Sequence, residues 1–400
     1  MNFLEKLLDG VAVEWKPLGE VCRFINGKAY KQQELLEAGK YPVLRVGNFF
    51  TNGNWYYSDL ELEEDKYCDK GDLLYAWSAS FGPKIWDGEK VIYHYHIWKV
   101  VPDASMISKK YLFYLLAWDT EALKAESGTG STMMHVGKGA IEKRLVPIPC
   151  PDNPEKSLAI QAEIVRILDT FTALTAELTA ELTAELTDRQ KQYNYYRDRL
   201  LTFEKGEVEW KTLGEVAIIG TGSRNTNEAV LKGKYPFFVR SQEPRAINEY
   251  EFDETAIITA GDGVGVGKVF HFISEKYALH QRAYRIVVTT GDIMPKFLFH
   301  FIRFNFSQYL ATTSVHASVT SLRKPMFEKY PVPVPPPTEQ ARIVAILDKF
   351  DTLTTSIREG LPREIALRQK QYEYYRDLLL TFPKPEEVEA HLNSMEKSHG

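Results

Sequence analysis

The chain carries an internal duplication, and this feature limits its possible folds more than any other. Residues 14–21 read EWKPLGEV and return at residues 209–216 as EWKTLGEV. Residues 161–169 read QAEIVRILD and return at residues 340–348 as QARIVAILD. Because the repeated blocks keep one order, we expect two copies of a unit that consists of a globular part followed by a helical arm.

The first arm contains a second, shorter repeat. Residues 175–186 read Thr-Ala-Glu-Leu three times over, and neither Gly nor Pro occurs between Leu158 and Phe203. Ala, Glu and Leu are strong helix formers, so this stretch predicts one helix of about 40 residues, roughly 60 Å long. A period of four does not match the helical turn, so the Leu row drifts around the helix by about 40° per repeat. The pattern is typical of a spacer, and a low-complexity helix without a metric role is the alternative.

The second arm has the same length as the first, but Gly360 and Pro362 stand where the first arm has its repeats, so we expect a kink or break there. The first residues of the chain, Leu7 to Glu14, resemble what should follow Phe382, so the termini should meet as in a cut circle. The predicted parts are a first globular domain at residues 1–151, a first long helix at 152–205, a second globular domain at 206–337, a second long helix at 338–383 and a polar tail at 384–400.

Each globular part mixes predicted strands with one longer helix. Helices are expected at residues 109–125 and 295–311, and extended, proline-fixed linkers at residues 146–151 and 332–337. The fold class is therefore α+β, with two similar mixed α/β domains separated by a long antiparallel two-helix coiled coil in a pseudo-two-fold, circular arrangement. Strands are expected at residues 41–46, 71–77, 91–101, 235–240, 256–260, 266–273 and 279–289, and a strand plus a turn at residues 14–26 and 209–220.

The bulk composition fits a globular protein and argues against several classes. No apolar run is long enough to cross a membrane, and the N-terminus lacks the apolar core of a signal peptide, so we expect no membrane partner and a cytoplasmic location. Cys22, Cys68 and Cys150 lie far apart, which fits a reducing compartment without disulfides or structural zinc. The net charge of −5 argues against a wholly basic surface, but nucleic acid needs only a local positive field.

Motifs that indicate catalysis are weak or missing in the sequence. Residues 261–268 read GDGVGVGK, which lacks the glycine spacing and the final Ser or Thr of a phosphate-binding loop, so we predict a glycine-rich turn. His94 and His96 lie two residues apart on a predicted strand, so they should face the same side, as a metal pair would, but no third ligand is evident nearby. We find no nucleophile motif, base-methylation signature or nuclease carboxylate cluster. The absence of such motifs favours a non-catalytic chain and gives no metal site.

Polar loops recur at matching places in the two globular parts. They combine Arg, Lys, Asn and Gln, which can bond base edges, with small residues and hydroxyls that can hold phosphates. For a single residue a solvated loop side chain is the simpler interpretation, and it is the recurrence that favours DNA. The candidate DNA-binding residues are Lys28, Lys31, Arg45, Asn48, Ser80, Lys84, His135 and Lys138 in the first part, and Ser223, Arg224, Asn225, Arg240, Gln242, Arg245, Lys268, Gln281, Arg282, His316 and Arg323 in the second.

The arms carry apolar residues at one-face helical spacing. Mutual packing of the two arms is the favoured use, docking of another subunit's helices is the alternative, and two seams could serve both. The candidate subunit-docking residues are Ile164, Leu168, Phe171, Ile343, Leu347 and Phe350.

These features together resemble the specificity subunits of Type I restriction–modification enzymes, over nearly the whole chain from Glu14 to Phe382. The resemblance is carried by the two EWK blocks, the proline-rich exits that end at Pro151 and Pro337, the repeated arms and the Thr-Ala-Glu-Leu spacer. It implies that each globular part is a target-recognition domain that reads one half of a bipartite site in double-stranded DNA. It also implies that the arms recruit two methyltransferase subunits, that restriction and translocase subunits join them, and that S-adenosylmethionine, ATP and magnesium bind to those partners.

A repeat that acts as a spacer has a predictable step. One tetrapeptide adds about 6 Å of helix, which equals at most about two base pairs of DNA. Two other functions stay open on the sequence alone: a coiled-coil scaffold with two ligand-binding lobes and no DNA, and a methyltransferase with degenerate motifs. Steep salt dependence of duplex binding would favour the DNA reader over the scaffold, and binding of S-adenosylmethionine to the isolated chain would favour the enzyme.

Overall fold

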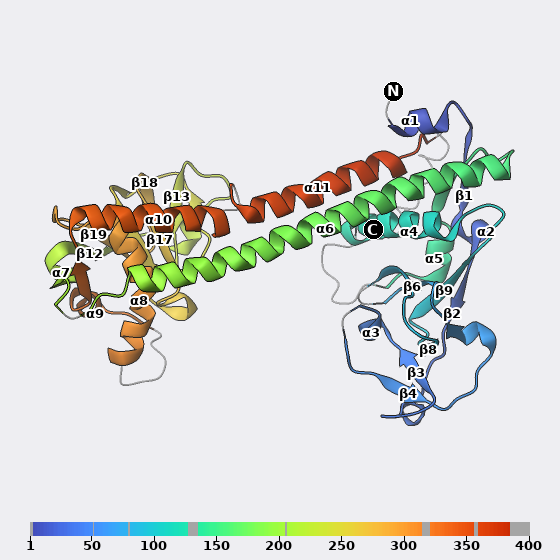
Figure 1. Cartoon of the computed structure of the whole chain (residues 1–400), viewed down its shortest axis with the longest axis horizontal. Helices are drawn as coiled ribbons and strands as arrows, with labels where there is room; N and C mark the ends of the chain where they lie inside the picture. The colour runs from blue at the N-terminus through green and yellow to red at the C-terminus, as the bar shows by residue number, and fades with distance from the viewer. Residues whose placement is uncertain are drawn as a thin grey trace. The chain divides into compact units, whose positions relative to one another are not determined.

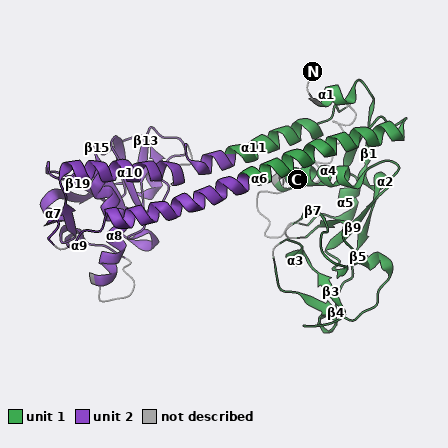
Figure 2. Ribbon diagram, viewed as in Figure 1, with its two compact units in different colours: residues 1–178, 367–400 green, residues 179–366 purple. Residues whose placement is uncertain are grey.

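The structure is a computed structural model that describes residues 3–50, 52–78, 81–126, 135–204, 206–313, 321–355 and 359–384. The chain divides into two compact units (Figure 2), which we call unit 1 (residues 1–178 and 367–400) and unit 2 (residues 179–366). The two helices α6 (Pro154–Leu200) and α11 (Leu361–Leu380) contribute residues to both units. The described helices include none that is both long and apolar enough to cross a membrane.

Unit 1 contains short strands, one longer helix and two arm segments (Figure 1). Its globular elements are α1 (Phe3–Leu8), β1 (Val13–Pro17), α2 (Leu18–Val21), β2 (Cys22–Asn26), η1 (Gln32–Glu34), β3 (Tyr41–Leu44), α3 (Val46–Phe50), β4 (Tyr56–Ser58), η2 (Glu64–Lys66), β5 (Tyr67–Cys68), β6 (Leu73–Ala76), β7 (Gly82–Ile85), β8 (Val91–Tyr93), β9 (Ile97–Pro102), α4 (Lys109–Glu126), α5 (Lys138–Glu142) and β10 (Leu145–Pro149). They form a β1-β10 ribbon, a sheet in the order β2-β9-β6-β7 and a sheet in the order β4-β3-β8-β5. Strands β3 and β8 are parallel, and the other pairs are antiparallel.

Unit 2 repeats this topology strand for strand. Its globular elements are β11 (Glu209–Thr212), α7 (Leu213–Val216), β12 (Ala217–Thr221), η3 (Thr226–Glu228), β13 (Tyr235–Phe238), β14 (Arg245–Ile247), β15 (Phe252–Asp253), β16 (Ala256–Ala260), η4 (Gly263–Gly265), β17 (Phe270–Ile273), β18 (Lys276–Leu279), β19 (Ala283–Val288), α8 (Pro295–Thr313), α9 (Lys324–Glu328) and β20 (Pro331–Val334). The ribbon is β11-β20, and the two sheets have the orders β12-β19-β16-β17 and β14-β13-β18-β15. The duplication expected from the sequence is thus confirmed at the level of strand order.

The arms are helical, as the sequence predicts. Helix α6 (Pro154–Leu200) is one helix of 47 residues, which corresponds to about 70 Å. The second arm consists of α10 (Pro337–Thr355) and α11 (Leu361–Leu380). The break falls beside Gly360 and Pro362, where a glycine is flexible and a proline favours the first turn of a new helix.

The arm helices are seated on the cores of their own units. Ile164 and Leu168 of α6 are fully buried in one cluster with Leu112 and Leu115 of α4. In unit 2, Ile343 and Leu347 of α10 are fully buried in one cluster with apolar residues of α8, including Phe297. These four residues are therefore closed to a partner subunit, which argues against the docking alternative for them. Each cluster also contains residues of the opposite arm, Leu379 and Leu380 in unit 1 and Tyr193 in unit 2, so the rows pack on the globular core and on the other arm together.

A buried glutamine fixes each arm to its unit. The Gln161 side chain is fully buried, accepts a hydrogen bond from the Ser108 backbone N–H at 2.8 Å and donates to the Met106 carbonyl at 2.8 Å. Gln340 makes the equivalent contacts in unit 2: it accepts from the Met294 N–H at 2.8 Å and donates to the Asp292 carbonyl at 2.7 Å. Each glutamine thus satisfies backbone groups of the segment that leads into α4 or α8, which would otherwise be buried without a partner.

The end of the chain completes unit 1, as the cut-circle interpretation requires. Leu379, Leu380 and Phe382 lie in the same buried cluster as Leu4 and Leu8 of α1. The Trp15 Nε1–H donates to the Pro383 carbonyl at 3.0 Å. In unit 2 the matching residues are supplied by the end of α6, where Leu201 is buried and Phe203 packs against the core. The predicted domain at residues 338–383 is consequently shared, because residues from 367 onward belong to unit 1.

Aromatic contacts pair the arms inside each unit. In unit 1, Phe171 of α6 stacks on Tyr375 of α11 with ring centroids 5.0 Å apart, and the Thr172 hydroxyl bonds the Tyr372 hydroxyl at 3.2 Å. In unit 2, Phe350 of α10 packs against Tyr193 and Tyr196 of α6 at 6.2 and 5.7 Å. In unit 1 the contacts run in opposite directions along the two helices: Phe171 meets Tyr375, and the following residue, Thr172, meets Tyr372. The two segments are therefore antiparallel.

Several local predictions need correction. The proline-rich exits are strands β10 and β20 rather than linkers, because they pair with β1 and β11 along their length. Residues 91–101 form two strands instead of one. His94 and His96 therefore lie in the turn between them and not on one face of a strand. Residues 18–21 and 213–216 form a helical turn, α2 and α7, before the strand that follows. Periodicity alone could not reveal these features because each depends on a partner strand or a short cap.

Replacing Gln340 by Leu should lower the free energy of unfolding of unit 2 by about 2–4 kcal/mol, because the Met294 N–H and the Asp292 carbonyl lose their partners inside the core. Chemical denaturation of the full chain measures this loss. The control is Gln308→Leu on the exposed face of α8, for which we expect a change within about 0.5 kcal/mol. Equal effects of the two substitutions would contradict the anchoring role.

Candidate nucleic-acid interface

In unit 1 several polar loops meet at one edge of the two sheets. Lys28 follows β2, Arg45 follows β3, Trp77 follows β6, and the turn of residues 94–96 connects β8 to β9. Backbone hydrogen bonds fasten these loops together: His94 N–H to the Leu44 carbonyl at 2.9 Å, Trp77 N–H to the His96 carbonyl at 3.1 Å and Lys28 N–H to the Tyr93 carbonyl at 3.0 Å. We call this group of loops the loop edge of unit 1.

Unit 2 has the same loop edge with the same backbone bonds. His280 N–H donates to the Phe238 carbonyl at 2.9 Å, and Gly261 N–H donates to the Arg282 carbonyl at 2.9 Å. Arg224 N–H donates to the Leu279 carbonyl at 3.2 Å, as Lys28 does to Tyr93. The position of His96 in unit 1 is therefore that of Arg282 in unit 2, and the position of Trp77 is that of Gly261.

A segment from beyond the long helix joins each edge. In unit 1 His135 forms an isolated β-bridge with Ser78, and the Val136 N–H donates to the Trp77 carbonyl at 3.0 Å. In unit 2 Ser321 forms the matching bridge with Asp262, and the Leu322 N–H donates to the Gly261 carbonyl at 2.7 Å. Ser78 and Asp262 therefore occupy the same place in the two units.

The edge of unit 1 is a half-buried cluster of aromatic rings and imidazoles. The Trp77 ring lies 4.9 Å from the His96 ring, 5.9 Å from the Tyr95 ring and 6.1 Å from the His135 ring. The His94 ring lies 4.6 Å from that of Tyr95. Arg45 adds a cation above the Tyr56 ring, at 4.3 Å from its centroid. Such a surface offers flat apolar contacts and hydrogen bonds with little net charge.

Burial favours the neutral form of His94, His96 and His280 by lowering the pKa of each ring. Burial, followed by the nearby His96 and Arg45 charges, lowers the pKa of His94 to about 4. Burial and the nearby His135 lower the pKa of His96, and burial and the Arg240 charge lower that of His280. A neutral imidazole has one donor and one acceptor, so these rings can match base edges but cannot neutralise phosphates.

The edge of unit 2 is built around one carboxylate and two guanidinium groups. Arg240 donates from Nη1 to Asp262 Oδ1 at 2.7 Å, and Arg282 donates from Nη1 to Asp262 Oδ2 at 3.0 Å. Burial acts to raise the pKa of Asp262, but the hydrogen bonds from both arginines outweigh it and hold the pKa below its usual value. Asp262 is therefore ionised at neutral pH, and the group carries a net positive charge.

The glycine-rich turn of residues 261–268 has a structural role in this edge. A Cβ on Gly261 would lie 2.6 Å from the Arg282 carbonyl oxygen, and a Cβ on Gly265 would lie 2.6 Å from the Arg240 carbonyl oxygen. Both distances are too short for any side chain. The glycines thus let the turn approach the backbones of the two arginines, and the predicted glycine-rich turn is confirmed.

Several predicted DNA-binding side chains are engaged within the protein. Arg224 donates one terminal nitrogen to Glu228 and the other to Glu249, both at 3.0 Å. Other such bonds join Ser223 to Glu251, Gln281 to Asn225, Lys28 to Glu34, and Asn48 to the carbonyls of Asn52 and Asn54. These residues shape the loops, so direct contact with DNA would require them to exchange partners.

The remaining predicted residues have different positions. Arg240, Arg282, Arg45 and His135 lie at the loop edges, while Lys84 lies within β7 beside Asp87 and Lys138 begins α5 beside Glu142. Exposed residues that the structure leaves open to solvent are Lys31, Gln242, Arg245, Lys268 and Arg323. Ser80 and His316 lie outside the described residues.

Sequence reasoning missed the residues that organise the edges. Trp77, Tyr95 and Asp262 were not candidates, and His94 and His96 were treated as strand residues. For Asp262 a usable signal did exist, because it comes just after the predicted strand of residues 256–260, where loops of neighbouring strands gather. The other residues were placed inside predicted strands that the structure ends earlier.

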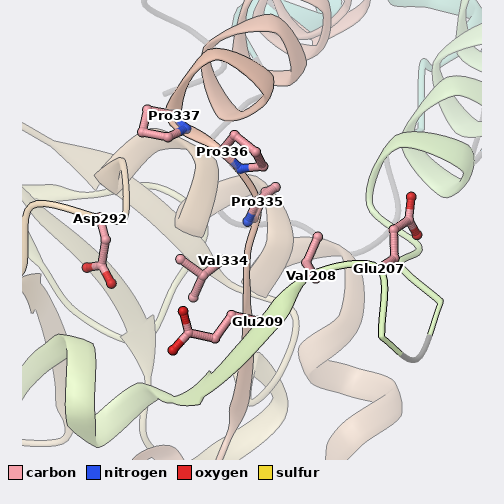
Figure 3. Close-up of a pocket in the computed structure, with 8 residues that line it drawn as sticks. All are labelled: Glu207, Val208, Glu209, Asp292, Val334, Pro335, Pro336 and Pro337. Carbon is pink, nitrogen blue, oxygen red and sulfur yellow. The ribbon is translucent and has the colours of Figure 1, made fainter.

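A surface hollow of about 340 Å³ in unit 2 offers a contrasting environment (Figure 3). The carboxylates of Glu207, Glu209 and Asp292 and the apolar side chains of residues 334–337 line it. Its charge would repel a phosphate group, so it does not extend the proposed interface. Among the described residues no three acidic, histidine or cysteine side chains come together as metal ligands.

The fold and the two loop edges define a class of protein: a duplicated binding protein whose two homologous units are joined by long helices. The sequence profile of the Type I restriction modification DNA specificity domain matches residues 11–188 and 205–367. The chain belongs to this family.

Similar proteins agree with this assignment over their whole length. The chain is 40% identical to the Type I restriction enzyme EcoR124I/EcoR124II specificity subunit of Escherichia coli, across 97% of this chain and 99% of that protein. It is 35% identical to the EcoprrI specificity subunit of E. coli, across 90% of this chain and 92% of that protein. The crystal structure of the S subunit of a Type I restriction–modification system from M. genitalium has the same fold, with a TM-score of 0.53 and 14% identity over 94% of this chain and 98% of that one.

The free energy of unfolding should fall as the pH drops from about 6.5 towards 4, because the unfolded chain takes up a proton on His94 that the folded chain resists. His94→Asn keeps an acceptor near the position of Nδ1 but cannot take up a proton. In this variant the slope of the free energy of unfolding against pH should fall by the equivalent of up to one proton between pH 6.5 and 4. Denaturation at a series of pH values measures the slope. An unchanged slope in the variant would show that His94 is not held neutral.

Proposed function

We propose that each unit reads one half of a bipartite target in double-stranded DNA with its loop edge. The chain is a DNA-recognition subunit of a Type I restriction–modification system and is not itself catalytic. The observation that carries the two-reader proposal is the pair of loop edges, which share one backbone scaffold but carry different side chains. A shared scaffold supports one docking geometry, and different side chains support two different half-site sequences.

The charge of the chain is compatible with this function. The net charge of −5 belongs to the whole sequence, whereas the loop edge of unit 2 carries Arg240 and Arg282 against one carboxylate. We infer that exposed cations of unit 2, such as Arg245 and Lys268, contact phosphates. Duplex binding should therefore weaken steeply with salt, which separates this function from the scaffold alternative.

We propose further that the Thr-Ala-Glu-Leu repeats of α6 set the spacing between the half-sites. The repeats lie inside one uninterrupted helix, in which the Thr183 hydroxyl bonds the Thr179 carbonyl at 2.7 Å and the Thr187 hydroxyl bonds the Thr183 carbonyl at 2.9 Å. The Thr183 and Thr187 hydroxyls are thus satisfied within the helix, whereas the Thr179 hydroxyl is buried without a partner among the described residues. Removal of one repeat keeps the helical register of the bonded threonines, because each hydroxyl donates to a carbonyl of the preceding repeat.

Deletion of Thr179 to Leu182 should shorten the unspecified spacer of the target by one or two base pairs and leave both half-site sequences unchanged. Insertion of a fourth copy should lengthen it by the same amount. Sequencing of the methylated sites in cells that carry the complete system measures both. An altered half-site with an unchanged spacer would contradict the ruler.

The partners that we propose are two methyltransferase subunits, together with restriction and translocase subunits. The arms present one exposed aromatic site twice: Tyr195 on α6 is 59% exposed and Tyr374 on α11 is 61% exposed. Each stands next to a tyrosine, Tyr196 or Tyr375, that stacks on the phenylalanine of the opposite arm. Two copies of one surface fit two copies of one partner, and tyrosine is common at the centre of protein interfaces.

Tyr374→Ala should leave one methyltransferase subunit firmly bound, and the double variant Tyr195→Ala/Tyr374→Ala should weaken both contacts by about tenfold or more. The subunit ratio measured by native mass spectrometry tests this. Tyr250→Ala, which removes an exposed tyrosine of a loop in unit 2, is the control and should keep both subunits. Full retention of both subunits by the double variant would place the docking surface elsewhere.

We expect the cofactors to belong to the partners, with S-adenosylmethionine on the methyltransferase subunits and ATP and magnesium on the translocase. We also expect the complex to work in the cytoplasm, where its DNA target is. Family membership over both halves of the chain disfavours the scaffold and the degenerate methyltransferase.

A further inference from the structure

The two loop edges carry chemically different side chains at two equivalent positions. Unit 2 has Asp262 and Arg282 where unit 1 has Ser78 and His96, as the matching β-bridges and backbone bonds show. Arg240, which follows β13, adds a second guanidinium to unit 2. The carboxylate with two arginines is thus specific to unit 2.

The geometry of this group leaves donors available for a ligand. Arg240 and Arg282 each use Nη1 for Asp262, and the described part of the chain provides no further side-chain bond to either guanidinium. Their side chains are 43% and 63% exposed, whereas Asp262 is only 20% exposed. The carboxylate therefore fixes the two guanidinium groups from beneath, and their remaining N–H groups are accessible to solvent.

Two other arginines of the described part of unit 2, Arg224 and Arg245, lack this arrangement. Arg224 has both terminal nitrogens bonded to glutamates and is only 25% exposed, so it is part of the scaffold. Arg245 is exposed at the start of β14 and has no ion pair with a described residue, as expected for a mobile phosphate contact. A guanidinium held in a fixed orientation suits a planar acceptor pair, whereas a free one suits a phosphate at many angles.

We propose that Arg240 and Arg282, oriented by Asp262, read guanine in the half-site of unit 2. Guanine presents the O6 and N7 acceptors in the major groove, and an arginine donates to both at once. Asp262 acts as a positioning residue through its bonds to the two guanidinium groups. This inference rests on the proposed function and assigns a base class to one of its two edges.

Among its described residues, unit 1 lacks the carboxylate with two arginines. His96 and Ser78 stand at the positions of Arg282 and Asp262, and the one guanidinium described at this edge, that of Arg45, lies over the Tyr56 ring. The half-site of unit 1 should consequently be insensitive to any change at Arg240 or Arg282, and it provides an internal control within one molecule.

The test uses the full chain in complex with its methyltransferase subunits and a pool of duplexes randomised at both half-sites. Sequencing of the bound fraction gives the base preference at every position. Arg282→Lys keeps the charge but loses the two-pronged donor, and Arg240→Lys does the same at the other arginine. Each should lower the preference for guanine at one base pair by roughly 5- to 150-fold, with the half-site of unit 1 unchanged.

Two further variants separate base reading from general effects. Arg245→Ala should weaken binding to all sequences alike and reduce the slope of log affinity against log salt by about one. Asp262→Asn should broaden the preference at the guanine position or positions, because both guanidinium groups lose their fixed orientation. Thermal unfolding of each variant verifies that unit 2 stays folded. If Asp262→Asn does not fold, the two lysine variants alone decide the test.

The possible results are distinct. The inference is overturned if the duplexes bound by the wild-type complex show no guanine preference in the half-site of unit 2. It is also overturned if the lysine variants lose the same affinity for every sequence. A wild-type complex that selects no bipartite sequence at all overturns the proposed function instead.

Discussion

The seating of each arm on its own unit is the interaction on which the rest of the structure depends. A fully buried glutamine, Gln161 or Gln340, bonds the backbone that leads into α4 or α8, and buried Ile and Leu residues beside it pack on those helices. A buried amide bonded to backbone groups on a second segment tolerates little sliding, because each displaced bond leaves a polar group unpaired in the core. The direction in which each arm leaves its unit is therefore fixed by the core and not by a flexible linker.

The loop edges apply the same principle to recognition. Backbone hydrogen bonds between strand ends hold the loops in both units, so side chains can change without altering the frame. Unit 1 uses this frame to present rings and neutral imidazoles, and unit 2 uses it to present two guanidinium groups on a carboxylate. A rigid frame with exchangeable side chains is a general way to vary specificity while keeping the fold.

The main predictions that depend on residues close together in the chain were confirmed, whereas particular side-chain contacts between residues far apart in the chain were not predicted. The duplication, the long helix α6 and the break near Gly360 depend on local patterns, and the structure confirms them. The burial of Ile164 and Leu168 was predicted, but not that α4 shares in covering them, because an apolar face shows that a helix is covered but not by which elements. The pairing of Arg240 with Asp262 was equally hidden, since the two residues lie on different loops that only the sheet brings together.

The sequence by itself determined the number of units, their order and the helical character of the arms, because repeats and helix-forming residues act over short stretches of chain. It also determined that the end of the chain should return to its beginning, through the repeated LLTF and EWK blocks. The tertiary structure decided which polar side chains face solvent and which form hydrogen bonds within the protein. That decision depends on hydrogen bonds between residues far apart in the chain, such as Arg282 with Asp262 or Arg224 with Glu249, and no local pattern encodes such bonds.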